Sequence, residues 1–328
     1  MKLGSLHLKN NLILSPLLNV TSPVYRRFCR HFTEIGLVCV PMLYAKRLQT
    51  RPKSPEFELQ KIEQESPISV QIVGKDEEAI KESVIYLESY EFDVLDLNAG
   101  CPSKRAIHGK YGGYLLSDLD KLNRLINLMT KYSSKPVSVK VRTGFNKELE
   151  VKEFLNLINE TNMDFLTVHA RTVKDRFNES TINLDFLKNL KKSTDIPIVG
   201  NGDIFTPESA KQFLDKTNVD ALMIGRGSMG NPEIFRYVKD YITNNRDTSL
   251  ENNRELMRSY IEIFEKILED FLDGIDISYS KYDYRFVELK RNAIWLTKNI
   301  ENSTTIRKKL GESKTLKQLK TFLEEYLK

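Results

Sequence analysis

The sequence predicts an α/β fold, a (β/α)8 TIM barrel followed by a small C-terminal all-α helical domain, on three observations. Eight short apolar or β-branched runs recur over ~240 residues, each followed by a stretch with helical spacing, as in a barrel. No G-x-G-x-x-G motif follows the first run, which disfavours an open dinucleotide-binding sheet. After Tyr241 the strand pattern ends and helical periodicity continues alone.

Several of the eight runs, such as IPIVG and DALMIG, are almost continuously apolar, as expected of parallel strands buried on both faces. Helices are predicted between the runs, for example over residues 76–90 and 206–217. The second has Thr206 as N-cap and Pro207 at its first helical position. The eight predicted strands are 12–18, 37–43, 68–73, 94–98, 137–142, 165–170, 196–200 and 221–225.

The C-terminal part is predicted to be separate from the barrel. Residues 244–253 are polar and are predicted to form a linker, so the barrel is assigned to residues 1–243 and the helical domain to residues 244–328. More helix is expected over 286–299 and 314–327. The residues on one face of the first helix of this domain are Leu256, Tyr260, Phe264, Ile267, Leu268 and Phe271.

Charge and cysteine content limit the class of protein. The 328 residues carry a formal net charge of +5, which is compatible with a nucleic-acid partner. Basic residues concentrate in 285–320, either as a solvated face or as a surface for a phosphate backbone. The three cysteines match neither a disulfide framework nor a zinc site, and no run approaches the ~20 apolar residues of a membrane span. A cytoplasmic protein without metal or membrane contact is expected.

Small and polar residues follow nearly every predicted strand, where a barrel places its active site. The segments GNGD (200–203) and GRG (225–227) resemble a phosphate site, because glycine N–H groups allow close approach and Arg226 adds a charged donor. The alternative is that these glycines only form tight turns. Lys140 lies inside an apolar strand and would need an anion or ring oxygen nearby, either as a Schiff-base lysine or beside a reduced flavin.

Two further side chains are candidates for chemistry. His169 lies at the end of the sixth predicted strand. It is either a site residue or a structural histidine whose hydrogen bonds are satisfied. Cys101 follows a strand end and precedes Pro102, so it is predicted to lie on a loop, although a lone cysteine is more often a small buried apolar residue. Cys29 and Cys39 lie in a helical and a strand pattern and are predicted to serve packing.

Six segments carry a family resemblance: LNAGCPSK, GGYLL, VKVRTG, VHARTV, PIVGNGDI and ALMIGRGSMGNP. Together, and in this order, they resemble the tRNA-dihydrouridine synthases, across the whole barrel and more weakly in the helical part. The resemblance implies FMN at the top of the barrel, NADPH or NADH as reductant and tRNA as partner. It also implies that hydride passes from flavin N5 to C6 of a flipped-out uridine, while Cys101 protonates C5. A monomer is expected.

The resemblance assigns roles to matching residues of this chain. Gln71 and Lys140 are expected at the edge of the flavin ring, and His169 near it. The residues expected beside the ring are Pro16, Leu17 and Leu18; those expected to hold the phosphate are Asn201, Gly202, Asp203, Gly225 and Arg226. Substrate contacts are expected from Asn98, Lys104, Arg142, Arg171 and Arg291.

Three other functions share parts of this pattern. An FMN-dependent barrel reductase of a small molecule, similar to dihydroorotate dehydrogenase, would have the same phosphate site and Lys140, but it would not need a basic helical domain. A barrel aldolase would use Lys140 as its Schiff-base lysine. A tRNA-binding protein with a vestigial site would not be expected to retain Cys101, Lys140, His169 and Arg226 together.

Overall fold

The computed structural model describes residues 1–328 apart from 54–55, 252, 276–279 and 299, and apart from the side chain of residue 63. The strands of its main sheet are β3 (Leu12–Leu14), β4 (Leu37–Cys39), β5 (Leu43–Tyr44), β6 (Ile68–Val73), β7 (Val94–Ala99), β8 (Val137–Gly144), β9 (Phe165–Thr172), β10 (Ile198–Asn201) and β11 (Ala221–Ile224).

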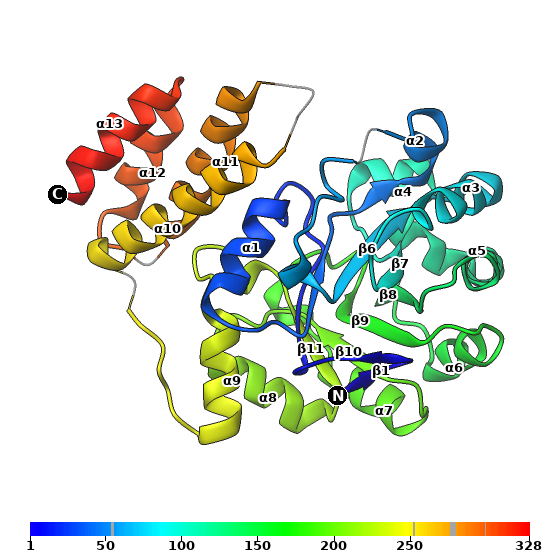
Figure 1. The fold of residues 1–328 in the computed structure, drawn as a ribbon. Coiled ribbons are helices and arrows are strands. Elements are labelled where there is room, and N and C mark those ends of the chain that lie inside the picture. Colours follow the sequence, from blue (N-terminus) through cyan, green and yellow to red (C-terminus); the bar gives the residue numbers. More distant parts are fainter. Residues whose placement is uncertain (54–55, 252, 276–279, 299) are drawn as a thin grey trace.

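All of these strands pair in parallel, in the order β4-β3-β11-β10-β9-β8-β7-β6-β5. An additional pairing of β4 with β6 closes the sheet, so the predicted barrel is confirmed (Figure 1). The predicted strand 37–43 is wrong as one element, because it divides into β4 and β5, which both pair with β6. The first strand also ends early, at Leu14, because the chain turns away from the sheet at Pro16, which has no N–H to donate.

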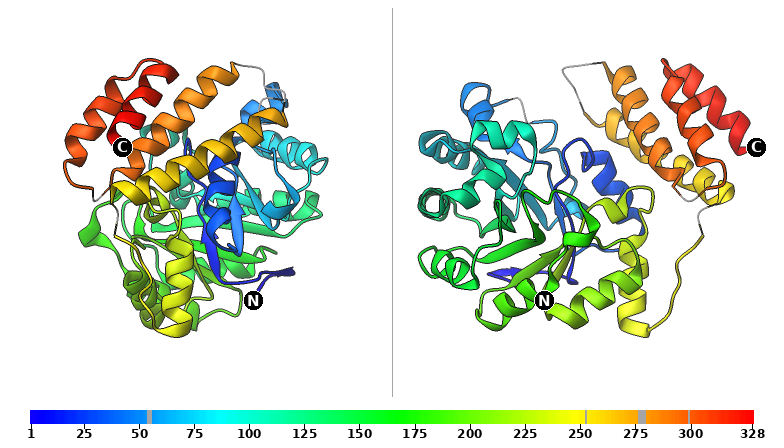
Figure 2. Two further views of the ribbon diagram at one scale, coloured as in Figure 1. Left: turned by 60° about the vertical axis from the view of Figure 1, so that its left-hand side comes forward. Right: turned by 180° about the vertical axis from the view of Figure 1, so that it is seen from behind.

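Helices follow the strands and surround the barrel (Figures 1 and 2). They are α1 (Pro23–Phe32), α2 (Ala45–Thr50), α3 (Glu77–Leu87), α4 (Lys104–Gly109), α5 (Leu119–Tyr132), α6 (Val151–Asn159), α7 (Leu184–Lys192), α8 (Pro207–Thr217) and α9 (Ile234–Asn244). The predicted cap of α8 is confirmed, since Thr206 Oγ1 accepts a hydrogen bond from Ser209 N at 3.2 Å. Such a cap satisfies an N–H group that has no partner within the helix.

A short N-terminal hairpin, β1 (Lys2–Leu3) and β2 (Leu6–His7), was not among the predicted elements. Leu3 is buried in a cluster with Leu37, Val94 and Phe165, which are the first residues of β4, β7 and β9. The hairpin therefore closes the N-terminal end of the barrel. The carboxyl ends of the strands, at the opposite end, are where a site can form.

The C-terminal part contains α10 (Arg254–Asp273), α11 (Lys281–Leu296), α12 (Ser303–Glu312) and α13 (Leu316–Leu327). On the predicted face of α10, Tyr260, Phe264, Leu268 and Phe271 are buried, whereas Leu256 and Ile267 are half-buried. Asn244 belongs to α9, so it is not part of a linker. Asn252 of the predicted linker and Asn299 of the predicted helix 286–299 lie outside the described residues.

Aromatic side chains join α10 to the barrel at α1. The ring of Phe28 lies 5.1 Å from that of Phe264, and the ring of Phe32 lies 5.4 Å from that of Tyr260. The division of the chain at residues 243 and 244 stays a prediction. In the described part of the chain, no helix has the length and apolar character needed to cross a membrane.

Candidate active site at the carboxyl ends of the barrel strands

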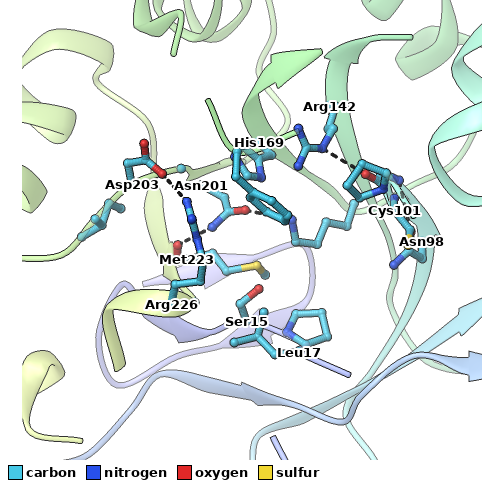
Figure 3. Close-up of a pocket in the computed structure, with 18 of the residues that line it drawn as sticks. Ser15, Leu17, Asn98, Cys101, Arg142, His169, Asn201, Asp203, Met223 and Arg226 are labelled. Atoms are coloured by element: carbon cyan, nitrogen blue, oxygen red, sulfur yellow. Dashed lines mark hydrogen bonds and ion pairs between the residues drawn. The ribbon is translucent and has the colours of Figure 1, made fainter. Parts of the chain in front are cut away.

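A cavity opens at the carboxyl ends of the strands, and most of the predicted site residues line it (Figure 3). These residues are Pro16, Leu17, Leu18, Asn98, Cys101, Lys140, Arg142, His169, Asn201, Gly202, Asp203, Gly225 and Arg226. They come from the strands β7, β8, β9 and β10 and from the segments that follow β3, β7, β10 and β11. Residues scattered over the sequence therefore meet around one space.

One side of the cavity is suited to an anion. None of the backbone N–H groups of residues 202–204 and 225–227 donates a hydrogen bond to another described residue. Arg226 Nη2 donates to Asp203 Oδ1 at 2.6 Å, yet 37% of the Arg226 side chain is exposed. Free N–H groups and a guanidinium at the end of parallel strands are typical of phosphate sites.

Aromatic rings and a second arginine hold Arg226 in place. Its guanidinium lies 4.6 Å from the centre of the Phe177 ring and 5.3 Å from that of Phe205. Asp203 is also paired with Arg171, which is fully buried and does not line the cavity. Arg171 therefore orients the carboxylate that orients Arg226, while its own Nε donates to Asn178 O at 2.7 Å.

Lys140 lies on the floor of the cavity. Its Nζ donates to Asn201 Oδ1 at 2.9 Å, and Asn201 Nδ2 donates to Met223 O at 2.7 Å. Burial lowers the pKa of Lys140 to about 8, and the positive charge of Arg142 acts in the same direction. Because no carboxylate pairs with it among the described residues, this ammonium favours an anionic or electron-rich group in the cavity.

Cys101 lies on the opposite side of the cavity from Asp203 and Arg226 (Figure 3). Asn98 Oδ1 accepts hydrogen bonds from Cys101 N at 3.0 Å and from Gly100 N at 3.2 Å, which fixes the loop. Cys101 is partly exposed, whereas Cys29 and Cys39 are buried. Burial raises the pKa of both buried thiols, so Cys101 is the cysteine available to a substrate.

Gln71 supports this loop from behind and does not line the cavity. Its Oε1 accepts from Asn98 Nδ2 at 2.8 Å, and its Nε2 donates to Asp96 Oδ2 at 2.6 Å. Ser138 also donates to Asp96, whose pKa is raised by burial. The chain Asp96–Gln71–Asn98 therefore positions the Cys101 loop.

Arg142 and His169 complete the wall between Cys101 and Arg226. Arg142 is buried and donates to Thr172 O at 2.8 Å, to Arg176 O at 2.6 Å and to Gly100 O at 3.1 Å. Burial, together with the neighbouring cations, lowers the pKa of His169 well below its ordinary value. The imidazole is therefore neutral near pH 7. Arg171 Nη1, which can only donate, lies 3.4 Å from Nε2, so Nε2 is the acceptor and Nδ1 carries the proton.

Besides Arg171, two of the expected substrate contacts lie outside the cavity. Lys104 is exposed on α4. Arg291 pairs with Glu288 at 2.7 Å and lines a second cavity, which also includes Ser22, Glu58 and Tyr284. Sequence reasoning missed Met42, Phe177, Phe205 and Met223 as lining residues. Phe177, which is 49% exposed on the loop after β9, could have been found as an aromatic residue in a loop that follows a polar strand end.

The comparisons with known proteins show the family of the chain. The profile of the family described as Dihydrouridine synthase (Dus) matches residues 13–328. tRNA-dihydrouridine synthase B of Pasteurella multocida (strain Pm70) is 35% identical over 248 residues, which cover 74% of this chain and 73% of that protein. A probable tRNA-dihydrouridine synthase of Rickettsia conorii (strain ATCC VR-613 / Malish 7) is 26% identical over 309 residues, covering 93% and 90%.

Solved structures are similar in fold. A variant of NCR from Zymomonas mobilis superposes with a TM-score of 0.52 at 15% identity, covering 79% of this chain and 93% of that one. A complex of 2-naphthoyl-CoA reductase with 2-naphthoyl-CoA gives a TM-score of 0.53 at 11% identity, covering 75% and 52%. At these identities the similarity supports the barrel alone.

Proposed function

The chain belongs to the dihydrouridine synthase family, and we propose that it reduces the C5–C6 bond of uridines in tRNA, using a flavin bound in the cavity and Cys101 as the proton donor. The observation that carries this proposal is that one cavity holds an anion site around Arg226 at one side and an accessible thiol at the other. A small-molecule reductase would share the anion site but has no specific observation in its favour.

The cavity fits FMN. The free N–H groups of residues 202–204 and 225–227, with Arg226, suit its phosphate, and Lys140 suits the electron-rich edge of its ring. Pro16, Leu17 and Leu18 offer an apolar surface from the loop after β3. When bound and reduced by NADPH or NADH, FMN supplies the hydride that reaches C6 of uracil. Gln71, in this proposal, acts through Asn98 rather than on the ring.

Cys101 supplies the other atom that the reduction requires. Addition of a hydride at C6 leaves negative charge on the C5–C4–O4 part of the ring, and the Cys101 thiol gives its proton to C5. Asn98 and Gly100 hold this thiol in place through the hydrogen bonds of the loop. Neutral His169 can donate a hydrogen bond to a uracil oxygen without carrying its own charge into the cavity.

The uridine must leave its stack to reach Cys101, because the thiol lies at a cavity and not on an open surface. Binding of the tRNA on both sides of the target nucleotide would compensate for the lost stacking.

The test is the substitution Cys101→Ala, assayed by anaerobic reoxidation of the reduced flavin with uridine-containing tRNA. We expect bound flavin to be retained and turnover to fall by roughly 10²–10⁴-fold, the usual contribution of a general acid. Cys29→Ala, which changes a buried cysteine of α1 that does not line the cavity, is the matched control. Undiminished dihydrouridine formation by Cys101→Ala would exclude Cys101 as the proton donor. If tRNA does not reoxidise the flavin of the parent protein, tRNA is excluded as the substrate.

A further inference from the structure

Two short segments at the cavity rim are strongly basic. Residues 44–53 and 97–117 contain no aspartate or glutamate. The exposed basic residues in these segments are named here the rim patch: Lys46, Arg47, Arg51 and Lys53 in and after α2, with Lys104, Arg105, His108 and Lys110 in and after α4.

Aromatic contacts make the rim patch one surface. The guanidinium of Arg105 lies 4.9 Å from the centre of the Tyr44 ring, at the N-terminal end of α2. The Tyr44 ring contacts that of Tyr111, after α4, edge to face at 6.1 Å. Figure 1 shows α2 and α4 next to each other on one side of the barrel, with helices α10–α13 on the other side. Basic side chains interleaved with aromatic rings suit single-stranded nucleic acid.

The charge of the rim patch is not neutralised within the part of the chain that the structure describes. None of its members forms an ion pair there, and Lys46 Nζ donates to the neutral Gln49 at 2.7 Å. Several cations of the helical domain are neutralised instead: Arg285 by Glu269, Arg291 by Glu288 and Lys320 by Glu265. Positive charge without an ion-pair partner among the described residues therefore lies on the barrel beside the cavity.

The position of the rim patch relates it to the reaction. Met42 lines the cavity and α2 begins three residues later; Pro102 lines it and α4 begins two residues later. Cys101 Sγ lies 3.4 Å from Ser103 Oγ, the N-cap of α4. The rim patch thus flanks the side of the cavity that holds the thiol. In Figure 3 this side, with Cys101 and Asn98, lies opposite Asp203 and Arg226.

We propose that the rim patch binds the sugar–phosphate backbone of the tRNA strand next to the target uridine. This rests on the proposed function, because a nucleotide that enters the cavity toward Cys101 carries its neighbouring phosphates past α2 and α4. Lys and Arg contacts to phosphates position a nucleic acid without reading its sequence. Tyr44 and Tyr111 add ring surface against which a ribose or base can pack. The phosphates of NADPH share this chemistry and are the alternative source.

The experiment uses the flavin-loaded full chain with Arg47→Glu and Arg51→Glu combined. The matched control is Lys188→Glu with Lys192→Glu, an equal change of charge at exposed positions of α7. We expect the KM for tRNA to rise about tenfold or more at physiological salt. The slope of log KM against log[salt] should decrease by roughly one to two, because two phosphate contacts are lost. The control pair should keep the parental values.

Three results would overturn the proposal. A parental KM for tRNA in the Arg47/Arg51 variant would make the rim patch a solvated face. An equal rise in the KM for tRNA in the α7 control would show that the effect depends on the total charge of the protein and not on the rim patch. A weaker affinity for NADPH during flavin reduction, with an unchanged KM for tRNA, would assign the patch to the dinucleotide. Failure of the parent itself to be reoxidised by tRNA would instead count against the proposed function.

Discussion

At the scale of single residues, Lys140 is a partly buried cation in the proposed cofactor site. Its strand neighbours Val139 and Val141 are fully buried in the apolar core, and its ammonium donates a hydrogen bond to the neutral amide of Asn201. A cation in such a place has a lowered pKa, here about 8, because transfer from water disfavours the charged form. The ammonium is therefore present below pH 8 and is lost as the pH rises through this value.

We expect the affinity of the apoprotein for FMN to decrease between pH 7 and pH 9, because the loss of the Lys140 proton removes a positive charge from the cavity. Titration of flavin fluorescence at each pH measures this. Lys140→Met should bind FMN more weakly than the parent at pH 7 and show a flatter profile. A parent whose affinity is constant over this range would show that Lys140 does not contact the flavin.

The sequence predicted most of the residues around the cavity, because strand ends could be located from apolar runs and the polar residues after them. Arg171 and Gln71 were predicted to contact ligands and instead lie behind Asp203 and Asn98. Arg171 lies two residues after the lining residue His169 on the same face of β9, and Gln71 is hydrogen-bonded to the lining residue Asn98. The alternation of a strand therefore predicts the face of each side chain but not whether a neighbouring side chain covers it. Phe177 and Phe205 were missed, since a loop has no periodicity that shows where its side chains point.

At the scale of elements, a buried ion pair attaches the segment before β6 to α1. Arg26 Nε donates to Glu65 Oε1 at 2.9 Å, and both side chains are buried. Arg26 also donates to Gln60 O at 2.8 Å, and Glu65 Oε2 accepts from Ile62 N at 3.0 Å. Each partner compensates for the burial of the other, so that removing one leaves an unpaired charge.

Glu65→Gln is expected to lower the free energy of unfolding by about 3–5 kcal/mol, the usual cost of breaking a buried pair from one side. Urea unfolding followed by far-UV circular dichroism measures the change. Glu34→Gln, which breaks the exposed pair of Glu34 with Lys9, is the control and should leave the midpoint unchanged. Equal stability of Glu65→Gln and the parent would mean that the backbone contacts alone hold this segment.

Long and strongly patterned elements were predicted well, and short ones were not. The hairpin of β1 and β2 has two residues in each strand, too few for an alternating pattern. Helix α12 was not assigned because only Ile306 and Leu310 of its ten residues are buried, which leaves a weak apolar stripe. The division of 37–43 into β4 and β5 depends on pairing with β6, a contact between segments far apart in the sequence.

At the scale of the whole molecule, the barrel and the helical part share one core. A single cluster of buried apolar residues includes Phe28 of α1 and Phe264 of α10. Tyr260 Oη donates to Glu233 Oε1, before α9, at 3.0 Å. A Cβ atom at Gly230 would lie 2.2 Å from Trp295 O, so the chain after β11 touches α11 directly. An apolar interface of this kind favours joint unfolding over independent domain motion.

We therefore expect one cooperative unfolding transition for both parts. Trp295, the only tryptophan, lies at the junction with its ring 5.7 Å from that of Tyr25, so its fluorescence reports the separation of α11 from α1. The midpoint of the fluorescence change in urea should coincide with that of the far-UV ellipticity, which reports all helices and strands.

Phe264→Ala should lower both midpoints together, because it leaves a cavity in the shared core and reduces the free energy of unfolding by about 3–5 kcal/mol. Ile85→Ala, at a half-exposed position of α3, should shift neither. A fluorescence change that precedes the ellipticity change would mean that the helical part separates from a folded barrel, and tRNA could then be bound by a domain that moves.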